Sequence, residues 1–531
     1  MSVPATGHAV ETLTSLALSL AVAGWLLPTQ PRLRAASGMA TLVLAPLALL
    51  VVVTGDNESS LPAISLPFGT AVAAAGLAAV AATAALCRRF PRAVVPAALA
   101  ALPFRVPLEV GGESVKLLLP LYLVIAGAVV AYAYGAWRAD AEPGRAPKLL
   151  DVAFSGFLVL YALQGAYSGD VSVASQNAAF FYAPFALLYG IVAANRWDAA
   201  QLRACALILA GLALLLVGAG FVEYARGEYL IRPGGIKPND FDPYFRIQSL
   251  FFDPNIFGRF VALVMVMVAA VMIFTGKSRR VLGSALVLAA LLAGLVLTLS
   301  QSSFAALLAG LVALAAMRWN ARWVLGAAGA AALAGMIFVL AAPSVSGVDL
   351  TDSRSAEAST SGRFDLITGG VTLWSERPLW GYGSGSFADA FDRRRLARES
   401  AFGSPTTTKS HTAPLTVAAE QGLIGFAAYT ALLAAAFAAV FRRVRVDRRP
   451  GTVARVAVAA AFTALFVHSL IYAAFLEDPL TWVMAGIAVS LAAIGSGAPG
   501  GPDAPGEPNA QSAPGDLGGS RGPGDAAKAA S

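Results

Sequence analysis

Long apolar runs alternate with short polar interruptions along almost the whole chain. A helix needs about 17 to 25 mainly apolar residues to cross a bilayer, because its backbone polar groups must be satisfied within the segment. The runs begin near Thr12, Ala40, Pro67, Ala93, Leu117, Leu149, Ala178, Leu202, Asn255, Val281, Ser303, Val324, Thr412, Ala454 and Leu480, and the Ala93 run is short. They predict an all-α polytopic membrane protein with about 12 to 15 transmembrane or membrane-embedded helices.

Composition strengthens this prediction and excludes other classes. Of the 531 residues, 57% are hydrophobic and 13% are charged, whereas soluble domains carry about a quarter charged residues. Two cysteines, Cys87 and Cys205, are too few for a disulfide scaffold or a cysteine zinc site. The net charge of +7 does not indicate nucleic acid as a partner, because the basic residues lie between apolar runs rather than on one soluble face.

The distribution of Lys and Arg predicts the orientation. Loops on one side of the predicted helices, with the C-terminal tail, hold 23 of them and loops on the other side hold 14. Since cytoplasmic loops carry the excess, we expect the N-terminus outside and the C-terminus in the cytoplasm. The first run follows MSVPATGHAVE, which has no basic region, so we expect a retained helix rather than a cleaved signal.

The same pattern divides the chain into four segments. We expect N-terminal transmembrane helices over 1–342, a large extracytoplasmic loop over 343–410, C-terminal transmembrane helices over 411–494, and a disordered cytoplasmic tail over 495–531. The loop holds eight basic and eight acidic residues, which favours a neutral folded unit. The tail is rich in Gly, Pro and Ala and cannot bury enough apolar area to offset its ordering entropy.

The predicted outer loop also contains one helical pattern. Four of its apolar residues fall on one face at helical spacing: Phe364, Ile367, Val371 and Trp374. We expect this amphipathic helix to lie over the membrane domain on that face. Pro378 should end it.

Histidines are few: His8, His411 and His468. His411 stands where the outer loop re-enters the membrane, and a neutral imidazole facing a cavity suits a general base. The alternative is a helix-entry residue that binds backbone, and the sequence leaves both open. His468 is expected to bond a neighbouring helix rather than to act in chemistry.

Arginines remain on the predicted outer side although the charge bias should deplete them there: Arg105, Arg226, Arg232, Arg246 and Arg363. Arginine forks bind phosphate oxygens, so a lipid phosphate or diphosphate is a natural ligand. Arg259 lies near the start of a predicted helix and could reach the same place. The alternative is that these side chains pair with Asp or Glu, or extend to the interface.

Two further motifs lie outside the predicted helices. In RPLWGYGSGSF, Gly381, Gly383 and Gly385 permit tight turns and close backbone approach to a ligand. Asp240 and Asp242 form a DxD between two prolines, which indicates a turn rather than a metal site.

In this order the motifs resemble the O-antigen ligase and O-antigen polymerase superfamily of bacterial membrane glycosyltransferases. The resemblance covers about Arg246 to Leu480 and rests on RIQSLFFDPNIFGRF, on VLTLSQSS, and on Gly362, Arg363, Trp374, Pro378, Leu379, Gly381, Gly383, Gly385, Phe387, His411, Leu415, Glu420, Gly422 and Gly425. The sequence departs from the family pattern at Thr412, where Asn is usual, at Leu366, where Trp is common, and at 301–303, which lack an arginine.

The resemblance implies a C-type glycosyltransferase fold in the cytoplasmic (inner) membrane and an inverting reaction without metal or cofactor. The donor would be an undecaprenyl-diphosphate-linked glycan and the acceptor a glycan or glycolipid. His411 would be the base, and Arg246, Arg363 and Arg259 would bind the diphosphate. Supporting residues would be Asn255, Gly381, Gly383, Gly385 and Glu420.

Ligase, polymerase and protein-glycosylating activities share these donor motifs, so the sequence does not separate them. An exporter or other transporter is the rival from a different class. It predicts an internal repeat with broken helices and ionisable residues near the membrane midplane. The chain shows no such repeat, and its charges cluster on the predicted outer side.

Overall fold

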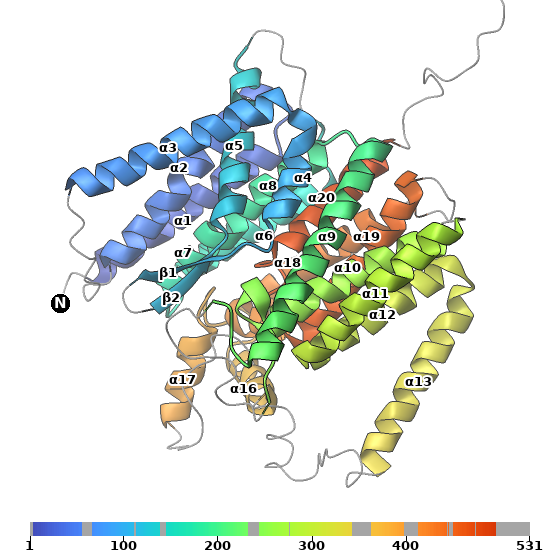
Figure 1. The fold of residues 1–531 in the computed structure, drawn as a ribbon. Helices are drawn as coiled ribbons and strands as arrows, with labels where there is room; N and C mark the ends of the chain where they lie inside the picture. Colours follow the sequence, from blue (N-terminus) through green and yellow to red (C-terminus); the bar gives the residue numbers. More distant parts are fainter. Residues whose placement is uncertain are drawn as a thin grey trace, which may run out of the picture.

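The computed structural model describes residues 4–55, 66–110, 113–138, 145–231, 244–274, 277–341, 363–397, 412–442, 444, 450–472 and 474–494. In these ranges the chain is almost entirely helical (Figure 1). The elements are α1 (Pro4–Leu26), α2 (Pro31–Gly55), α3 (Leu66–Arg89), η1 (Pro91–Ala93), α4 (Val94–Ala101), β1 (Val106–Val110), β2 (Glu113–Leu117), α5 (Leu119–Ala136), α6 (Leu149–Gly165), α7 (Val171–Asn177), η2 (Ala178–Tyr182), α8 (Ala183–Ala194), α9 (Ala199–Arg226), η3 (Ser249–Phe251), α10 (Pro254–Phe274), α11 (Ser278–Thr298), α12 (Gln301–Arg318), α13 (Ala321–Ala341), α16 (Arg363–Glu376), α17 (Phe387–Ala397), α18 (Ala413–Phe441), α19 (Pro450–Ile471) and α20 (Pro479–Ile494).

The helices confirm the predicted polytopic membrane protein. Within the described ranges, eleven are long and apolar enough to cross a membrane. Four more apolar helices are shorter, at Pro91–Ala101, Leu149–Gly165, Ala321–Ala334 and Pro479–Ala492. The predicted tail and much of the predicted outer loop lie outside the described residues.

One hairpin interrupts the helices, and helical periodicity did not predict it. β1 and β2 pair antiparallel, with Val106 opposite Leu117. The sequence VPLEVGGESVKL does hold the signal, since two glycines separate two short runs in which apolar and polar residues partly alternate.

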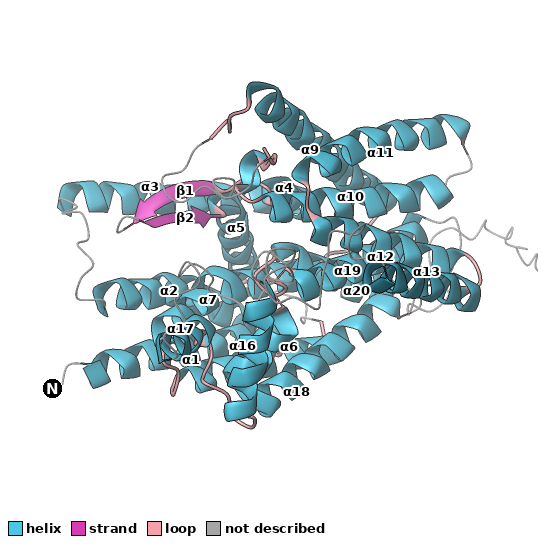
Figure 2. Ribbon diagram, turned by 90° about the horizontal axis from the view of Figure 1, so that it is seen from below, coloured by secondary structure: helices cyan, strands magenta, loops and turns pink. Residues whose placement is uncertain are grey.

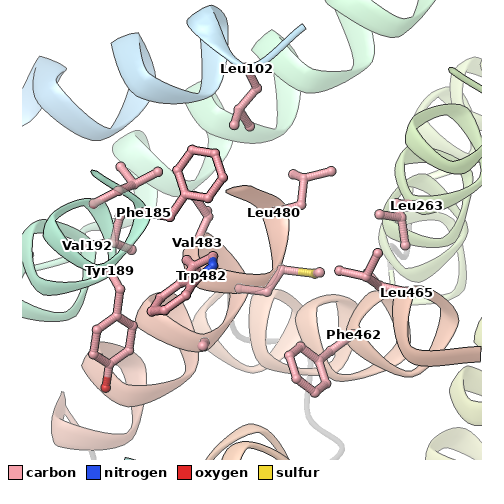
Figure 3. Close-up of a cluster of buried hydrophobic side chains, with 14 of the residues drawn as sticks. Leu102, Phe185, Tyr189, Val192, Leu263, Phe462, Leu465, Leu480, Trp482 and Val483 are labelled. Carbon is pink, nitrogen blue, oxygen red and sulfur yellow. The ribbon is translucent and has the colours of Figure 1, made fainter. Parts of the chain in front are cut away.

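Aromatic and aliphatic side chains pack the centre of the bundle (Figure 3). Trp482 of α20 is fully buried and stacks on Phe154 of α6, with ring centroids 4.2 Å apart. Its indole nitrogen donates to the Leu476 carbonyl at 2.8 Å. On α19, three consecutive alanines at 459–461 are fully buried, so neighbouring helices approach closely. Close packing of this kind stabilises helices in a membrane, where lipid competes equally for apolar surface.

α16 and α17 lie over one end of the bundle, in front of it in the view of Figure 2, and both contact α18. We call this the α16–α17 end. The predicted helix in this region is confirmed as α16, but its predicted buried face is wrong. Leu366 and Leu373 are buried, whereas Ile367, Val371 and Trp374 are exposed. The position of Phe364's side chain is outside what the structure describes.

Two glycines explain why the buried face of α16 differs from the predicted one. A Cβ at Gly370 would lie 2.9 Å from the Leu415 side chain of α18, and one at Gly369 would lie 2.2 Å from the Phe391 ring of α17. The glycine side of α16 therefore packs tightly against both neighbouring helices. A search for large apolar residues selects the opposite face, because it gives glycine no weight.

Candidate functional site

Arg246 is held by two helix ends at the α16–α17 end. Its Nε donates to the Thr298 carbonyl at the end of α11 (2.9 Å), and its Nη2 donates to Asn255 Oδ1 at the start of α10 (3.0 Å). The side chain is half-buried. These two bonds fix the orientation of the guanidinium.

Asp253 connects this arginine to two C-terminal helices. Its Oδ1 caps α10 by accepting from the N–H of Asn255 at 2.7 Å, and its Oδ2 accepts from the Tyr472 hydroxyl at 2.5 Å. Tyr472 directly follows α19. Two residues earlier, the Leu470 carbonyl accepts from the Thr412 hydroxyl at 3.2 Å. The start of α18 is thereby joined to the same assembly, which we call the arginine site: Arg246, Thr298, Asp253, Asn255 and Tyr472.

The backbone around the arginine site is strained. Non-glycine residues with positive φ number four among the described residues, namely Ser249, Phe252, Leu299 and Ala474. Ser249 and Phe252 lie between Arg246 and Asp253, and Leu299 follows Thr298. Ala474 follows Tyr472 by two residues. Such conformations cost about 1 to 3 kcal/mol each and are often found at functional sites, so their clustering marks this region.

Arg259 lies close by, in an ion pair. Its Nη2 is 2.6 Å from Asp478 Oδ2, and its Nη1 donates to the Ala474 carbonyl at 3.2 Å. Both side chains are buried. This is the alternative that the sequence left open, in which an arginine pairs with an acid. The signal for it was Asp478, an acidic residue in a short loop that follows a predicted helix.

His468 forms the interhelical bond expected of it. Its Nε2 lies 3.1 Å from the Ser302 hydroxyl of α12, and both residues are buried. Hydroxyl contacts continue to Ser300 (3.2 Å) and from there to Ser303 (2.8 Å). Ser303 donates to the Asn255 carbonyl at 3.3 Å. These contacts fix the turn whose first carbonyl, that of Thr298, accepts from Arg246.

The second part of the candidate site, after the arginine site, is the glycine turn. It comprises residues 378–386 and lies between α6 and α18. Gly381, Gly383 and Gly385 have φ of +69°, +101° and +78°. The N–H of Gly383 donates to the Glu420 carbonyl at 2.7 Å, and the Leu423 N–H donates to the Pro378 carbonyl at 2.7 Å. These backbone pairs exist because α18 is interrupted at Gly422, where φ is +61° and ψ is −163°.

Glu420 holds the turn through its side chain. Its two oxygens accept from the N–H groups of Gly385 (2.9 Å) and Phe387 (3.2 Å), and the residue is buried. From the α6 side, the Ser168 hydroxyl donates to the Ser384 carbonyl at 2.8 Å. Glu420 therefore orders the entry to α17.

The turn and the arginine site are joined by the first turns of α18. Eight residues separate Thr412 from Glu420, about 12 Å of helix at 1.5 Å per residue. Arg363 is the first residue of α16; its side chain, like His411 as a whole, lies outside the described residues. In the sequence, His411 immediately precedes Thr412.

Charge elsewhere at this end is modest. Asp389 of α17 pairs with Arg393 one turn later, yet burial raises the pKa of the Asp389 carboxyl, and the nearby Asp170 acts in the same direction. In the part of the chain that the structure describes, no group of three or more His, Cys, Asp or Glu residues is placed to hold a metal. Arg232, Asp240 and Asp242 fall outside it, and Arg226 is exposed at the end of α9.

In a comparison with known proteins, residues 285–430 match the model of a family described as O-antigen ligase. The match confirms the resemblance drawn from the motifs. It includes the Thr298 turn, α16, the glycine turn and the start of α18, but not Arg246, Asn255 or Arg259. No curated protein matches the chain.

Proposed function

Because residues 285–430 carry the O-antigen ligase family domain, we propose that this multi-pass membrane protein transfers a lipid-diphosphate-linked glycan to an acceptor hydroxyl. The transfer takes place at the α16–α17 end, which the Lys and Arg distribution assigns to the outer side of the cytoplasmic membrane. The N-terminus is then outside and the C-terminus in the cytoplasm.

One observation carries the proposal. The start of α18, which His411 precedes, is hydrogen-bonded through Thr412 to the end of α19, and α19 is joined through Tyr472 to Asp253 beside the fixed guanidinium of Arg246. The residue that follows the candidate base in sequence and the candidate phosphate ligand therefore belong to one assembly, although they are far apart in sequence. That combination is what transfer from a lipid diphosphate requires.

In the proposed reaction His411 removes the proton from the acceptor hydroxyl. The oxygen attacks the anomeric carbon as the bond from that carbon to the diphosphate oxygen breaks. Attack from the face opposite the leaving group inverts the anomeric configuration. The proton stays on His411, and the lipid diphosphate leaves with the bonding electrons.

Negative charge develops on the diphosphate as the bond breaks, and arginines stabilise this charge. Arg246, oriented by Thr298 and Asn255, is the first cation beside the phosphate oxygens. Arg363 supplies a second cation from the start of α16. We propose that these guanidinium groups replace a metal ion in the reaction.

Arg259 lies further from the diphosphate in this proposal and acts through other residues. Its ion pair with Asp478 joins α10 to the segment before α20 and holds Ala474 by a hydrogen bond. We propose that it positions the arginine site, while Asn255 orients Arg246 directly. Glu420 and the three glycines shape the turn that covers the site.

The test uses purified protein with a lipid-diphosphate glycan and separate acceptors: a glycolipid core, a second lipid-linked glycan and a peptide. Release of lipid diphosphate that depends on one acceptor supports transfer and distinguishes ligase, polymerase and protein glycosylation. Movement of intact donor across a vesicle membrane, without its cleavage, would identify a transporter instead.

A further inference from the structure

One edge of α16 is apolar and uncovered. Ile367, Val371 and Trp374 follow one another at helical spacing along this edge, and all three are exposed among the residues that the structure describes. The sequence from Leu366 to Ser375 contains no charged residue. An apolar edge of a helix normally packs against a core, and a helix face in water normally carries charge. This edge does neither, so its composition fits an apolar surrounding other than the protein core.

The charges that follow the apolar edge are directed to α17 instead. Glu376 pairs with Arg394 of α17 and accepts from the Tyr382 hydroxyl at 2.6 Å. The guanidinium carbon of Arg377 lies 4.4 Å from the centre of the same tyrosine ring. α17, at the same end of the bundle (Figure 1), carries the exposed Arg393. The two neighbouring helices therefore present different surfaces, one uncharged and one charged.

The glycine turn leads from the apolar edge to α18. Leu379 and Trp380 directly follow the proline that ends the helix, and they are exposed at 56% and 61%. The Ile424 N–H donates to the Leu379 carbonyl at 3.4 Å. Leu423 and Ile424 are also exposed, and they belong to α18, which is long and apolar enough to cross a membrane. The apolar surface thus reaches the lipid-facing side chains of a membrane span.

The interruption of α18 at Gly422 indicates the depth of this surface. From Leu423 to Phe441 the helix is about 28 Å long at about 1.5 Å per residue, which matches the hydrocarbon thickness of about 30 Å. Arg442 follows at the far end. The near boundary of the hydrocarbon therefore lies at Leu423, where α18 is bonded to the carbonyls of the glycine turn.

Exposed aromatic side chains accompany the apolar edge. Trp374 and Trp380 are two of them, and Tyr167, in the loop after α6, is the third. The Tyr167 hydroxyl donates to the Trp380 carbonyl at 2.6 Å. Tryptophan and tyrosine are enriched where a protein surface passes from hydrocarbon to lipid headgroups. This composition fits the interface of a bilayer.

We propose that α16 and the start of the glycine turn lie in the headgroup region of the membrane, with Ile367, Val371, Trp374, Leu379 and Trp380 directed towards the acyl chains. The occupant of this surface is the bilayer, and α17 stands in water. The α16–α17 end is thereby anchored in the membrane rather than held above it. The anchor goes beyond the proposed function, because it follows from the surface whichever reaction the site carries out.

Quenching of a fluorescent label tests the anchor in the full-length protein. The two buried cysteines, Cys87 and Cys205, are replaced by alanine, and Val371→Cys or Arg393→Cys is labelled with bimane in lipid nanodiscs that hold one copy each. Val371→Cys should lose most of its emission to a nitroxide on the lipid acyl chain and little to iodide in water. Arg393→Cys, whose arginine is exposed at 62% of its side-chain area, should show the reverse.

Thr372→Cys is the matched control on α16 itself. This position lies one residue further and about 100° around the helix, so nitroxide lipid should quench its label less than the label of Val371→Cys. Thermal unfolding close to that of wild type verifies that each labelled variant is folded.

Three outcomes would overturn the proposal. Stronger quenching of Val371→Cys by iodide than by nitroxide lipid would place α16 in water. Protection from both quenchers would mean that another part of the same chain covers the apolar edge, since a disc holds only one copy. Equal quenching of Val371→Cys and Thr372→Cys by nitroxide lipid would mean that the edge has no preferred side. None of these results depends on glycan transfer, so the proposed function is tested separately.

Discussion

At the glycine turn and at the arginine site the chain makes close contacts in opposite ways. In the turn, glycines take positive φ, and backbone lies directly against the backbone of α18. At the arginine site, serine, phenylalanine, leucine and alanine take positive φ, held there by buried polar contacts from several helices. The turn therefore depends on the absence of side chains, whereas the arginine site depends on their presence.

The largest loss of stability is expected from a substitution in the glycine turn. A Cβ at Gly381 would lie 2.3 Å from the Glu420 carbonyl oxygen, where neither backbone can move easily. Gly381→Ala should destabilise the protein by more than about 4 kcal/mol, or prevent its accumulation. The measurement is thermal unfolding in detergent, together with the protein level in the membrane.

A matched control separates the steric contact from the backbone conformation as the cause of this loss of stability. Gly227 also has a left-handed conformation, φ +63°, but a Cβ there would meet nothing within 4 Å. Gly227→Ala should cost only about 1 to 2 kcal/mol, from the conformation alone. Equal losses in the two variants would mean that close backbone approach does not govern the turn.

The second-largest loss of stability is expected from breaking the buried ion pair next to the arginine site. Asp478→Asn leaves the buried Arg259 without its counterion, which should cost about 3 to 5 kcal/mol. The double variant Arg259→Met with Asp478→Leu should recover most of the unfolding temperature, because no buried charge is left unpaired. A double variant no more stable than Asp478→Asn would contradict this account.

Arg246 should affect binding more than folding. It is half-buried and donates to one carbonyl and one amide oxygen, so Arg246→Gln should lower the unfolding temperature only slightly. Donor affinity should fall about 10-fold to 100-fold, since a bond to a charged phosphate is lost. Titration with a lipid diphosphate measures this loss. Unfolding as severe as that of Asp478→Asn would indicate that Arg246 is a structural residue.

The smallest effect concerns pH and α17. Burial raises the pKa of Asp389 in the folded protein, so the folded state binds the proton more tightly than the unfolded state does. This contribution is full below the unfolded pKa of about 4 and is lost as pH rises through the folded value. Asp389→Asn should stabilise the protein by less than about 1 kcal/mol at pH 7, and the gain should shrink towards pH 4. A gain that grows on acidification would reverse the sign.

Sequence reasoning located the helices and the turn, because both depend on local pattern. Apolar length predicted the spans, and alternating glycines predicted a tight turn. The close approach was predicted towards a ligand, whereas Gly381 makes it to the backbone of α18. Sequence reasoning chose the wrong face of α16, where Gly369 and Gly370 make the contacts. Glycine carries no hydrophobic signal, so packing through it is invisible to periodicity.

The partners of the arginines could not be read from the sequence. Arg246 binds a carbonyl 52 residues away, and Arg259 binds one 215 residues away. A carbonyl is present at every residue, so only the fold decides which one accepts. The Arg246–Asn255 pair also lies outside the matched family region and reaches it through hydrogen bonds to Thr298 and Ser303.

Lipid diphosphate release with and without His411 tests the central claim most directly. Purified wild type, with donor, the preferred acceptor and excess chelator, should release lipid diphosphate at the rate seen without chelator. His411→Ala should bind the donor with unchanged affinity but release lipid diphosphate about 100-fold to 10,000-fold more slowly, as expected on removal of a general base. Near wild-type release by His411→Ala would contradict the account and transfer the role of base to another group.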